Sequence, residues 1–350
     1  MSHFPARLKS ARLMSGFSLE GLAERLDYRV SRQALYKYEQ GDMSPDASLL
    51  PYLCQTLHVP PDYFYREYSI DLGKISFRKL EKLTATEQKI AIEKTRDFLE
   101  RYIELESLLG ERVDLQNPIN GRKPDGLADA ENLALVLRKE FNLGHDPFSN
   151  VIELLEGLGI RVLEIELHED FSGMSTWVDG KIPVIVVNKI LDKKLYRKRF
   201  TVLHELGHLF LDIEDLPEKD QERFCDAFAG AMLLPSDSLK EKIGDSRRNL
   251  LDRELLLIKQ EFGISVRAVL FRAKQAGIIS EYEFKEHMIA LSKRYGKKDE
   301  PGEYIGSEQA NRFWHLLYRA LAEEVISESK AAALAGMRLA EFRDQIKVPK

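Results

Sequence analysis

The chain has 350 residues, of which 44% are hydrophobic and 31% are charged, so it can bury a sizeable core and has room for two or three domains. Its formal net charge of −5 excludes a global attraction to nucleic acid, and any such binding has to come from a local surface. Two cysteines exclude a disulfide framework. Without a long apolar run or a signal-peptide core, we expect no membrane contact and a cytoplasmic location.

Residues 1–68 are predicted to form an all-α bundle of short helices joined by short loops. Ala23 is a small residue suited to a close helix crossing, Leu35 is a core position on the next helix, and Gly41 can end that helix. These spacings predict a helix-turn-helix. The segments VSRQALYKYEQG, SPDASLLPYLCQTLHV and PPDYFYRE resemble the Cro/repressor-type DNA-binding domain, although the turn DYRV is about two residues longer than the commonest form.

In that geometry, the helix that follows the turn enters the major groove by its N-terminal end. The side chains expected on its exposed face are those of Ser31, Arg32, Gln33, Tyr36 and Lys37. Arg32 can bond a guanine edge, Gln33 can bond an adenine edge, and Lys37 can contact a phosphate. Four further basic side chains are expected at phosphates, namely Arg7, Lys9, Arg12 and Arg29.

The charge of this region bears on how it binds DNA. Residues 1–50 hold 7 Lys and Arg against 6 Asp and Glu, which is a weak positive surplus. We therefore expect affinity for operator DNA to require two copies of the domain, as in a homodimer. The alternative is a helix-turn-helix bundle that makes only protein contacts.

Residues 69–125 are predicted to form a helical connector and a linker. Thr84 and Glu87 form a capping box, which predicts the start of one long helix that continues to Gly110. Its apolar residues approximate a heptad stripe, so coiled-coil pairing and packing on a neighbouring domain both stay open. The stretch 117–126, with two Pro and two Gly, is the best linker in the chain.

Residues 126–296 are predicted to form a domain of helices and a small sheet. The expected elements are helices around 127–141 and 148–158, a strand at 160–165, and strands at 172–178 and 182–187. Asp179 and Gly180 predict a tight turn between the last two strands. One of these strands could offer an edge on which an extended peptide is laid for cleavage, and a purely structural sheet is the alternative.

The run RFTVLHELGHLFLD contains His204, Glu205 and His208 in the pattern H-E-x-x-H. Residues four apart lie on one face of a helix, so both imidazoles can bind one Zn²⁺. The surrounding residues are so apolar that the helix must be largely buried, which suits a metal site that excludes water. Glu205 projects about 100° round the helix from His204, where it can act as a general base instead of binding the metal.

A third metal ligand is needed, and the next helix supplies two carboxylates. Glu222 and Asp226 are four apart in ERFCDAFAGAMLLP, so they share one helix face. Glu222 completes a set of two histidines and one glutamate with a position open for water, and Asp226 can accept the N–H of a ligand histidine. Both could instead be solvated helix charges. Gly207 favours the metal site, because a glycine inside a helix costs about 1 kcal/mol relative to Ala and indicates close packing of another backbone.

The segments PVIVVN, RKRFTVLHELGHLFLD and ERFCDAFAGAMLLP together resemble the ImmA/IrrE-type zinc metallopeptidases of bacteria and their mobile elements, over about residues 126–280. The resemblance implies an α+β zincin-like metallopeptidase domain with a small sheet, and it implies the metal ligands and base already named. This chain has Cys225 where the family pattern usually has Ala. A redox role or an alternative-ligand role is therefore open for this thiol.

Residues 250–295 are predicted to be helical, and EFGISVRAVLFRAKQAGIIS resembles the usual close of the peptidase domain. Arg267 and Arg272 are accordingly expected to be structural or polar-surface residues. A charged linker, KRYGKKDEPG, follows. Residues 297–350 then form a short helical unit that looks like a small repressor-type helix pair. Because it lacks a basic surface, docking or self-association is favoured over DNA contact.

As a whole, the sequence predicts a multidomain, predominantly α protein. We expect a bacterial or mobile-element transcriptional regulator that combines operator-DNA binding with zinc-dependent endopeptidase activity on a regulatory protein. The resemblance implies a protein partner, either a repressor or a small toxin beside which the chain acts as an antitoxin. The alternative is a DNA-binding antitoxin or repressor whose zinc site is structural. Glu205 favours the enzyme, since a structural site needs no base.

Overall fold

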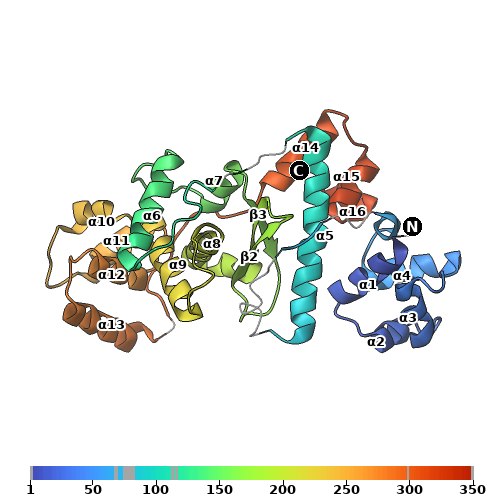
Figure 1. The fold of residues 1–350 in the computed structure, drawn as a ribbon, viewed down its shortest axis with the longest axis horizontal. Helices are drawn as coiled ribbons and strands as arrows, with labels where there is room; N and C mark the ends of the chain where they lie inside the picture. Colours follow the sequence, from blue (N-terminus) through green and yellow to red (C-terminus); the bar gives the residue numbers. More distant parts are fainter. Residues whose placement is uncertain are drawn as a thin grey trace. The chain divides into compact units, whose positions relative to one another are not determined.

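The computed structural model describes most of the chain (Figure 1). The described residues are 3–66, 70–73, 83–111, 115, 117–297 and 299–347. Part of the expected connector, chiefly 74–82, lies outside the described residues. The chain divides into two compact units, one of residues 1–73, 77–113 and 311–350 and the other of residues 74–76 and 114–310. Among the described residues, no helix is both long and apolar enough to cross a membrane.

The first unit begins with a helix-turn-helix bundle. Its helices are α1 (Phe4–Met14), α2 (Leu19–Arg25), α3 (Arg32–Gln40) and α4 (Leu50–Leu57), with 3-10 turns at Ala47–Leu49 and Pro61–Tyr65. The hydroxyl groups of Ser18 and Ser31 cap α2 and α3, and each accepts a backbone N–H from three residues further on. Ala23 and Leu35 are fully buried, and Gly41 ends α3 with a φ of 82°. The predicted helix-turn-helix is confirmed.

The turn between α2 and α3 is longer than the commonest form, and two of its residues adopt the left-handed backbone conformation. Asp27 and Tyr28 both have a φ of 52°, a conformation that costs an L-residue roughly 1–2 kcal/mol. Val30, the last residue of the turn, then enters the core of the bundle, where it is 6% exposed. Burial of this side chain sets where α3 begins and offsets part of the strain in the turn.

Two of the arginines expected at DNA phosphates belong to the interior of the first unit. Arg7 is 1% exposed, and its guanidinium binds the Glu100 carboxylate at 2.5 Å. Arg12 forms a two-point ion pair with Glu39, at 2.6 and 2.9 Å. The prediction that Arg7 and Arg12 contact phosphates is therefore wrong, because buried carboxylates already hold their guanidinium groups.

A long helix organises the rest of the first unit. The helices here are α5 (Ala85–Leu109), α14 (Arg312–Ala322), α15 (Glu328–Ala335) and α16 (Leu339–Gln345). The start of α5 is the predicted capping box of Thr84 and Glu87. Further along, Tyr102 and Leu105 of α5 share a buried core with Phe313 of α14. The heptad-like stripe of α5 thus packs against helices of its own unit, which lie beside it in Figure 1. This is packing on neighbouring helices, the second of the two alternatives; coiled-coil pairing with another chain stays a prediction.

The second unit combines a three-stranded sheet with helices. Its elements are α6 (Leu127–Glu140), α7 (Val151–Gly157), β1 (Arg161–Ile165), β2 (Gly173–Val178), β3 (Ile182–Asn188), a 3-10 helix (Lys189–Lys194), α8 (Leu195–Phe210), α9 (Glu218–Leu233), α10 (Ser236–Ile243), α11 (Asp252–Phe262), α12 (Val266–Gln275) and α13 (Glu281–Tyr295). The strand order is β1-β3-β2, with β1 parallel and β2 antiparallel to β3. Asp179 and Gly180, with φ values of 50° and 66°, form the predicted tight turn.

Helix α8 lies in the core of the second unit, between α9 and the sheet (Figure 1). Val202, Leu203 and Leu206 of α8 are fully buried, as the apolar sequence predicts. At the crossing with α9, a Cβ added to Gly207 would lie 3.2 Å from the Cα of Cys225. The close packing of another backbone at Gly207, which the sequence also predicts, is confirmed.

Buried charges fasten the start of α8. Lys198 and Arg199 are both fully buried. Lys198 donates to the Glu308 backbone carbonyl at 2.6 Å, and Arg199 forms an ion pair with the Glu308 carboxylate. The same carboxylate accepts two backbone N–H groups at the start of α7, at 2.9 and 3.0 Å. The segment around Glu308, which follows the expected charged linker, is thereby bound to α7 and α8.

Arg272 and Arg267 have structural roles, as expected. Arg272 is 1% exposed, donates to the Leu234 carbonyl at 3.0 Å and forms a two-point pair with Glu131 at 2.6 and 2.8 Å. Burial alone would raise the pKa of Glu131, but the hydrogen bonds and charge of Arg272 hold this pKa below its ordinary value. The pair therefore stabilises the unit above the unfolded-state pKa, and this contribution is lost as the pH falls through the folded-state pKa. Arg267 donates to the Gly296 carbonyl at 2.7 Å.

Asn188, at the end of β3, holds the loop that leads into β2. Its side-chain amide donates to three carbonyls of residues 167–171, at distances between 2.8 and 3.1 Å. Its Oδ1 accepts two backbone N–H groups, from Leu167 and Ile190. Because Asn188 is fully buried, these bonds satisfy the polar atoms of its own amide, and the bond to Phe171 also pairs a buried backbone carbonyl.

We expect Asn188→Leu to lower the free energy of unfolding of the second unit by at least about 2 kcal/mol, because each buried polar group left unpaired costs about 1–3 kcal/mol. The measurement is a urea titration followed by Trp177 fluorescence in a Trp314→Phe background, since these are the two tryptophans of the chain. Asn249→Leu, at an exposed position, is the control and should leave the midpoint almost unchanged. Equal midpoints for the two variants would contradict the assigned role of Asn188.

Candidate metal centre and DNA-binding face

Three side chains of α8 and α9 converge on one point. His204 and His208 lie one turn apart on α8, and their Nε2 atoms are 3.2 Å from each other. Glu222, in the second turn of α9, places Oε2 3.2 Å from the His204 nitrogen and Oε1 3.2 Å from the His208 nitrogen. Nitrogen donors around a tetrahedral zinc are about 3.3 Å apart. The fold therefore brings the three predicted ligands together at separations that one ion can bridge.

Asp226 lies behind His204, one turn after Glu222 on α9. Its Oδ1 is 2.8 Å from Nδ1 of His204. With the proton on Nδ1, His204 donates to this carboxylate, and the lone pair of Nε2 is directed toward Glu222 and His208. The arrangement suits the role predicted for Asp226, which is to hold a ligand histidine in the tautomer that binds a metal.

Glu205, the candidate base, is 2% exposed and contacts the sheet. Ser175 of β2 donates a hydrogen bond from its hydroxyl to Oε2 of Glu205, at 2.9 Å. Gly173 permits this close approach of β2, because a Cβ added there would lie 3.0 Å from the Thr201 side chain and 3.4 Å from that of Glu205. The sequence carries no signal for Ser175 or Gly173 as site residues, since only the fold places β2 beside this face of α8.

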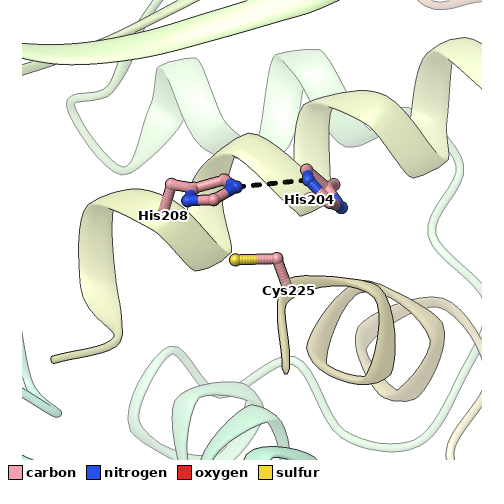
Figure 2. A group of neighbouring side chains, drawn as sticks. All are labelled: His204, His208 and Cys225. Atoms are coloured by element: carbon pink, nitrogen blue, oxygen red, sulfur yellow. Dashed lines mark hydrogen bonds between the residues drawn. The ribbon is translucent and has the colours of Figure 1, made fainter. Parts of the chain in front are cut away.

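Cys225 lies between Glu222 and Asp226 on α9 and faces the same turn of α8. Figure 2 shows its sulfur pointing toward the part of α8 that carries His204 and His208. One ligand atom from each of these three residues lies within 4.8 Å of the other two. The thiol is fully buried. The structure thus places a sulfur donor beside the nitrogen and oxygen donors.

The donor set fits zinc. Imidazole nitrogen, carboxylate oxygen and thiolate sulfur are the ligands that Zn²⁺ takes in proteins. The side chains of His204 and His208 are only 11% and 12% exposed. The apolar core around α8 limits the access of water to them. The carboxylate of Asp226 gives one imidazole the hydrogen-bond partner that metal-binding histidines normally have.

The candidate DNA-binding side chains lie on α3 in the first unit. All five are exposed, namely Ser31, Arg32, Gln33, Tyr36 and Lys37. Leu35 is fully buried among them, so α3 presents a polar face to solvent. Ser31 also caps the helix through its hydroxyl. Of the other residues expected at phosphates, Lys9 and Arg29 are exposed, and the Arg29 guanidinium lies 4.1 Å from the ring centre of Tyr52.

Two family models match the chain. Residues 8–64 match a helix-turn-helix model, which covers the bundle from α1 to the 3-10 turn after α4. Residues 155–274 match the IrrE N-terminal-like domain of the peptidase M78 family, which includes all the candidate residues of α8 and α9. No protein of curated function matches the chain.

We expect His204→Ala and His208→Ala each to abolish stoichiometric zinc binding, because each variant removes one of the two imidazole ligands. Glu222→Ala should weaken binding strongly, whereas Glu205→Gln should retain the metal. Asp226→Asn should lower the affinity by about 10- to 100-fold, the usual cost of losing the partner of a metal-binding histidine. Elemental analysis of the purified proteins and competition with a chromogenic chelator measure these effects.

Asp220→Asn is the matched control for these variants, because Asp220 is a partly exposed carboxylate on the same helix as Glu222 and pairs with Arg223 instead of the histidines. It should bind zinc as the unaltered chain does. Full zinc retention in either histidine variant would contradict the site, and unchanged affinity in Glu222→Ala would move the third ligand elsewhere.

Proposed function

We propose that this chain, which joins an N-terminal helix-turn-helix domain to an IrrE N-terminal-like domain, is a cytoplasmic transcriptional regulator with zinc-dependent endopeptidase activity on a regulatory protein. The convergence of His204, His208 and Glu222 carries the proposal, together with the buried Glu205 that follows the first histidine. The exposed polar face of α3 supports binding to operator DNA, and it is the reason to place the protein in the cytoplasm.

In this proposal, His204, His208 and Glu222 hold the metal and Glu205 is the base. Zinc, when bound, supplies a Lewis acid that makes water a better nucleophile and polarises the scissile carbonyl. Glu205 takes the proton of the attacking water and then passes it to the leaving amine. Ser175 holds the Glu205 carboxylate in one orientation through its hydrogen bond to Oε2, so the base does not have to be positioned during the reaction.

Strand β2 is the proposed binding edge for the substrate. It pairs with β3 on one side, and no other described strand pairs with its second side. It also contacts α8 through Gly173 and Ser175, close to Glu205. A peptide that adds to this edge as a further strand would be aligned by main-chain hydrogen bonds, with its backbone near the base.

The presence of both domains in one chain supports a DNA-bound substrate. A tether between two binding modules can give an effective concentration on the order of millimolar. A partner on the same operator would therefore be cleaved selectively even by a weak peptidase, and free protein would be spared. We propose that the substrate is a repressor or toxin-like partner bound at the operator, or a second copy of this chain.

A DNA-binding antitoxin or repressor with a structural zinc site is the second candidate. The observation that favours it is Cys225, because cysteine is a frequent ligand of structural zinc sites. In that case Glu205 would have no catalytic role, and the zinc would stabilise only the fold. The partner would tighten operator binding and would not be cut.

For DNA binding, we expect Arg32→Ala and Gln33→Ala to relax sequence preference, at a cost of roughly 1–3 kcal/mol for each lost base contact. Lys37→Ala should weaken binding to all sequences alike and reduce the salt dependence. Sites selected from randomised DNA and titrated by fluorescence anisotropy at several salt concentrations separate the two effects. Lys89→Ala, an exposed lysine on α5, is the control. If the full chain shows no salt-dependent DNA binding, the protein-contact alternative is correct.

For proteolysis, we expect Glu205→Gln to slow cleavage of the partner by about 100- to 10,000-fold, the contribution of a general base. Ser175→Ala should have a smaller effect, because the carboxylate remains and only its orientation is lost. Cleavage of the protein encoded by the adjacent gene, or of a second copy of this chain, is followed by mass spectrometry with and without operator DNA. Arg32→Ala/Lys37→Ala should lose only the acceleration by DNA. Equal cleavage by Glu205→Gln would refute the role of the base.

A further inference from the structure

We infer that the Cys225 thiol is a ligand of the metal ion held by His204 and His208, so that this chain has a sulfur donor in addition to the Glu222 carboxylate. The inference rests on the proposed metal site and concerns its ligand set. It gives the bound metal four protein ligands from two helices, two imidazoles on α8 and two anionic groups on α9.

The position of Cys225 on α9 is the first support. Glu222, Cys225 and Asp226 stand at relative positions 0, 3 and 4 of one helix, and such positions share a face. The outer two of these residues already contact the imidazoles of α8, at 3.2 Å from Glu222 and 2.8 Å from Asp226. Cys225 lies between these two residues in sequence and on the same side of α9, and Figure 2 shows its sulfur against the turn of α8 that joins the two histidines.

The three residues offer their ligand atoms to one region of space. One ligand atom from each of His204, His208 and Cys225 lies within 4.8 Å of the other two. In a tetrahedral zinc site, with bonds of about 2.0–2.1 Å to nitrogen and about 2.3 Å to sulfur, nitrogen and sulfur are about 3.6 Å apart. The bound of 4.8 Å is about 1 Å longer than this separation, so the three atoms lie near enough to be considered as one ligand set.

The backbone of α8 leaves room for the sulfur. A Cβ added to Gly207 would lie 3.1 Å from the sulfur and 3.2 Å from the Cα of Cys225. The absence of a side chain at 207 therefore lets Cys225 sit directly against the turn that links the two histidines. Because the thiol is fully buried there, it is shielded from solvent oxidants.

The chemistry of the step is a proton-for-metal exchange. The S–H bond breaks, its proton leaves to solvent, and the sulfur lone pair forms the bond to the metal, with no change in oxidation state. Two imidazoles, one carboxylate and one thiolate would fill the four positions of a tetrahedral zinc site, as in structural zinc sites. A thiolate ligand would therefore favour the second candidate function, in which the zinc stabilises the fold.

Cobalt substitution tests the ligand directly, without any substrate. The full-length protein is freed of metal with a chelator, reconstituted with Co²⁺ and examined for the near-ultraviolet charge-transfer band that a thiolate ligand produces. We expect the band in the unaltered chain, its loss in Cys225→Ser and Cys225→Ala, and its retention in Cys54→Ser. Cys54 is the only other cysteine of the sequence and lies in α4, outside the second unit.

The cobalt affinity of Cys225→Ser supplies the second readout. It should fall by more than the roughly 10- to 100-fold that loss of a partner behind a ligand histidine costs, because a direct metal bond is lost. Circular dichroism confirms that the serine and alanine variants are folded.

The outcomes separate this inference from the proposed function. If Co²⁺ binds in a manner that depends on His204 but gives no thiolate band, the metal site stands and the ligand role of Cys225 is refuted. If the band persists in both Cys225 variants, the inference is also refuted. If the unaltered chain binds no Co²⁺ and no Zn²⁺, the metal centre itself is refuted, and the proposed peptidase with it.

Discussion

The candidate centre depends on how closely α9 approaches α8. At Gly207 a single added carbon would lie 3.2 Å from the Cα of Cys225, so any other residue there would push the two helices apart. Glu222 and Asp226 are on the helix that would move. Their contacts with the imidazoles, at 3.2 and 2.8 Å, leave little tolerance for such a shift. A helix-interior glycine, which weakens α8 locally, is thus what allows donors from two helices to meet.

Contacts with the rest of the second unit fix the position of α8. Lys198 and Arg199, about one and a half turns before His204, are fully buried and bound to the segment around Glu308. Such buried ion pairs contribute little net stability compared with apolar packing, but removing one partner leaves an uncompensated charge, so they define the position of the helix sharply. On its other side, Ser175 ties Glu205 to the edge strand β2. A site built on fixed helices and a strand is held more precisely than one built on loops.

In the first unit, some arginines form ion pairs in the interior, whereas the polar side chains of α3 stay exposed. Arg7 and Arg12 pair with Glu100 and Glu39 inside the unit, although both arginines lie on a helix next to the expected DNA-binding helix. The polar side chains of α3 remain exposed. The basic residues available to DNA are therefore fewer than the composition of the region indicates, which strengthens the argument that binding requires two copies of the domain.

Local patterns in the sequence determined most of the elements of this protein. The capping box at Thr84, the turn at Asp179-Gly180 and the spacing of His204 and His208 act over a few residues, so the helices, the hairpin and the paired imidazoles could be predicted from the chain alone. Spacing also predicted the helix-turn-helix, and the resemblance to ImmA/IrrE-type peptidases named the second domain; a family model matches each of the two.

Only the tertiary structure decided which side chains meet across elements. Arg12 has the same local signature as an exposed arginine, and its burial follows from Glu39 on another helix. Ser175 and Gly173 lie about thirty residues before Glu205, and only the packing of β2 on α8 makes them part of the site. The sequence marks Cys225 as unusual, but it does not say which way the sulfur points. Contacts between residues far apart in the chain depend on how whole elements pack, and local periodicity carries no information about that packing.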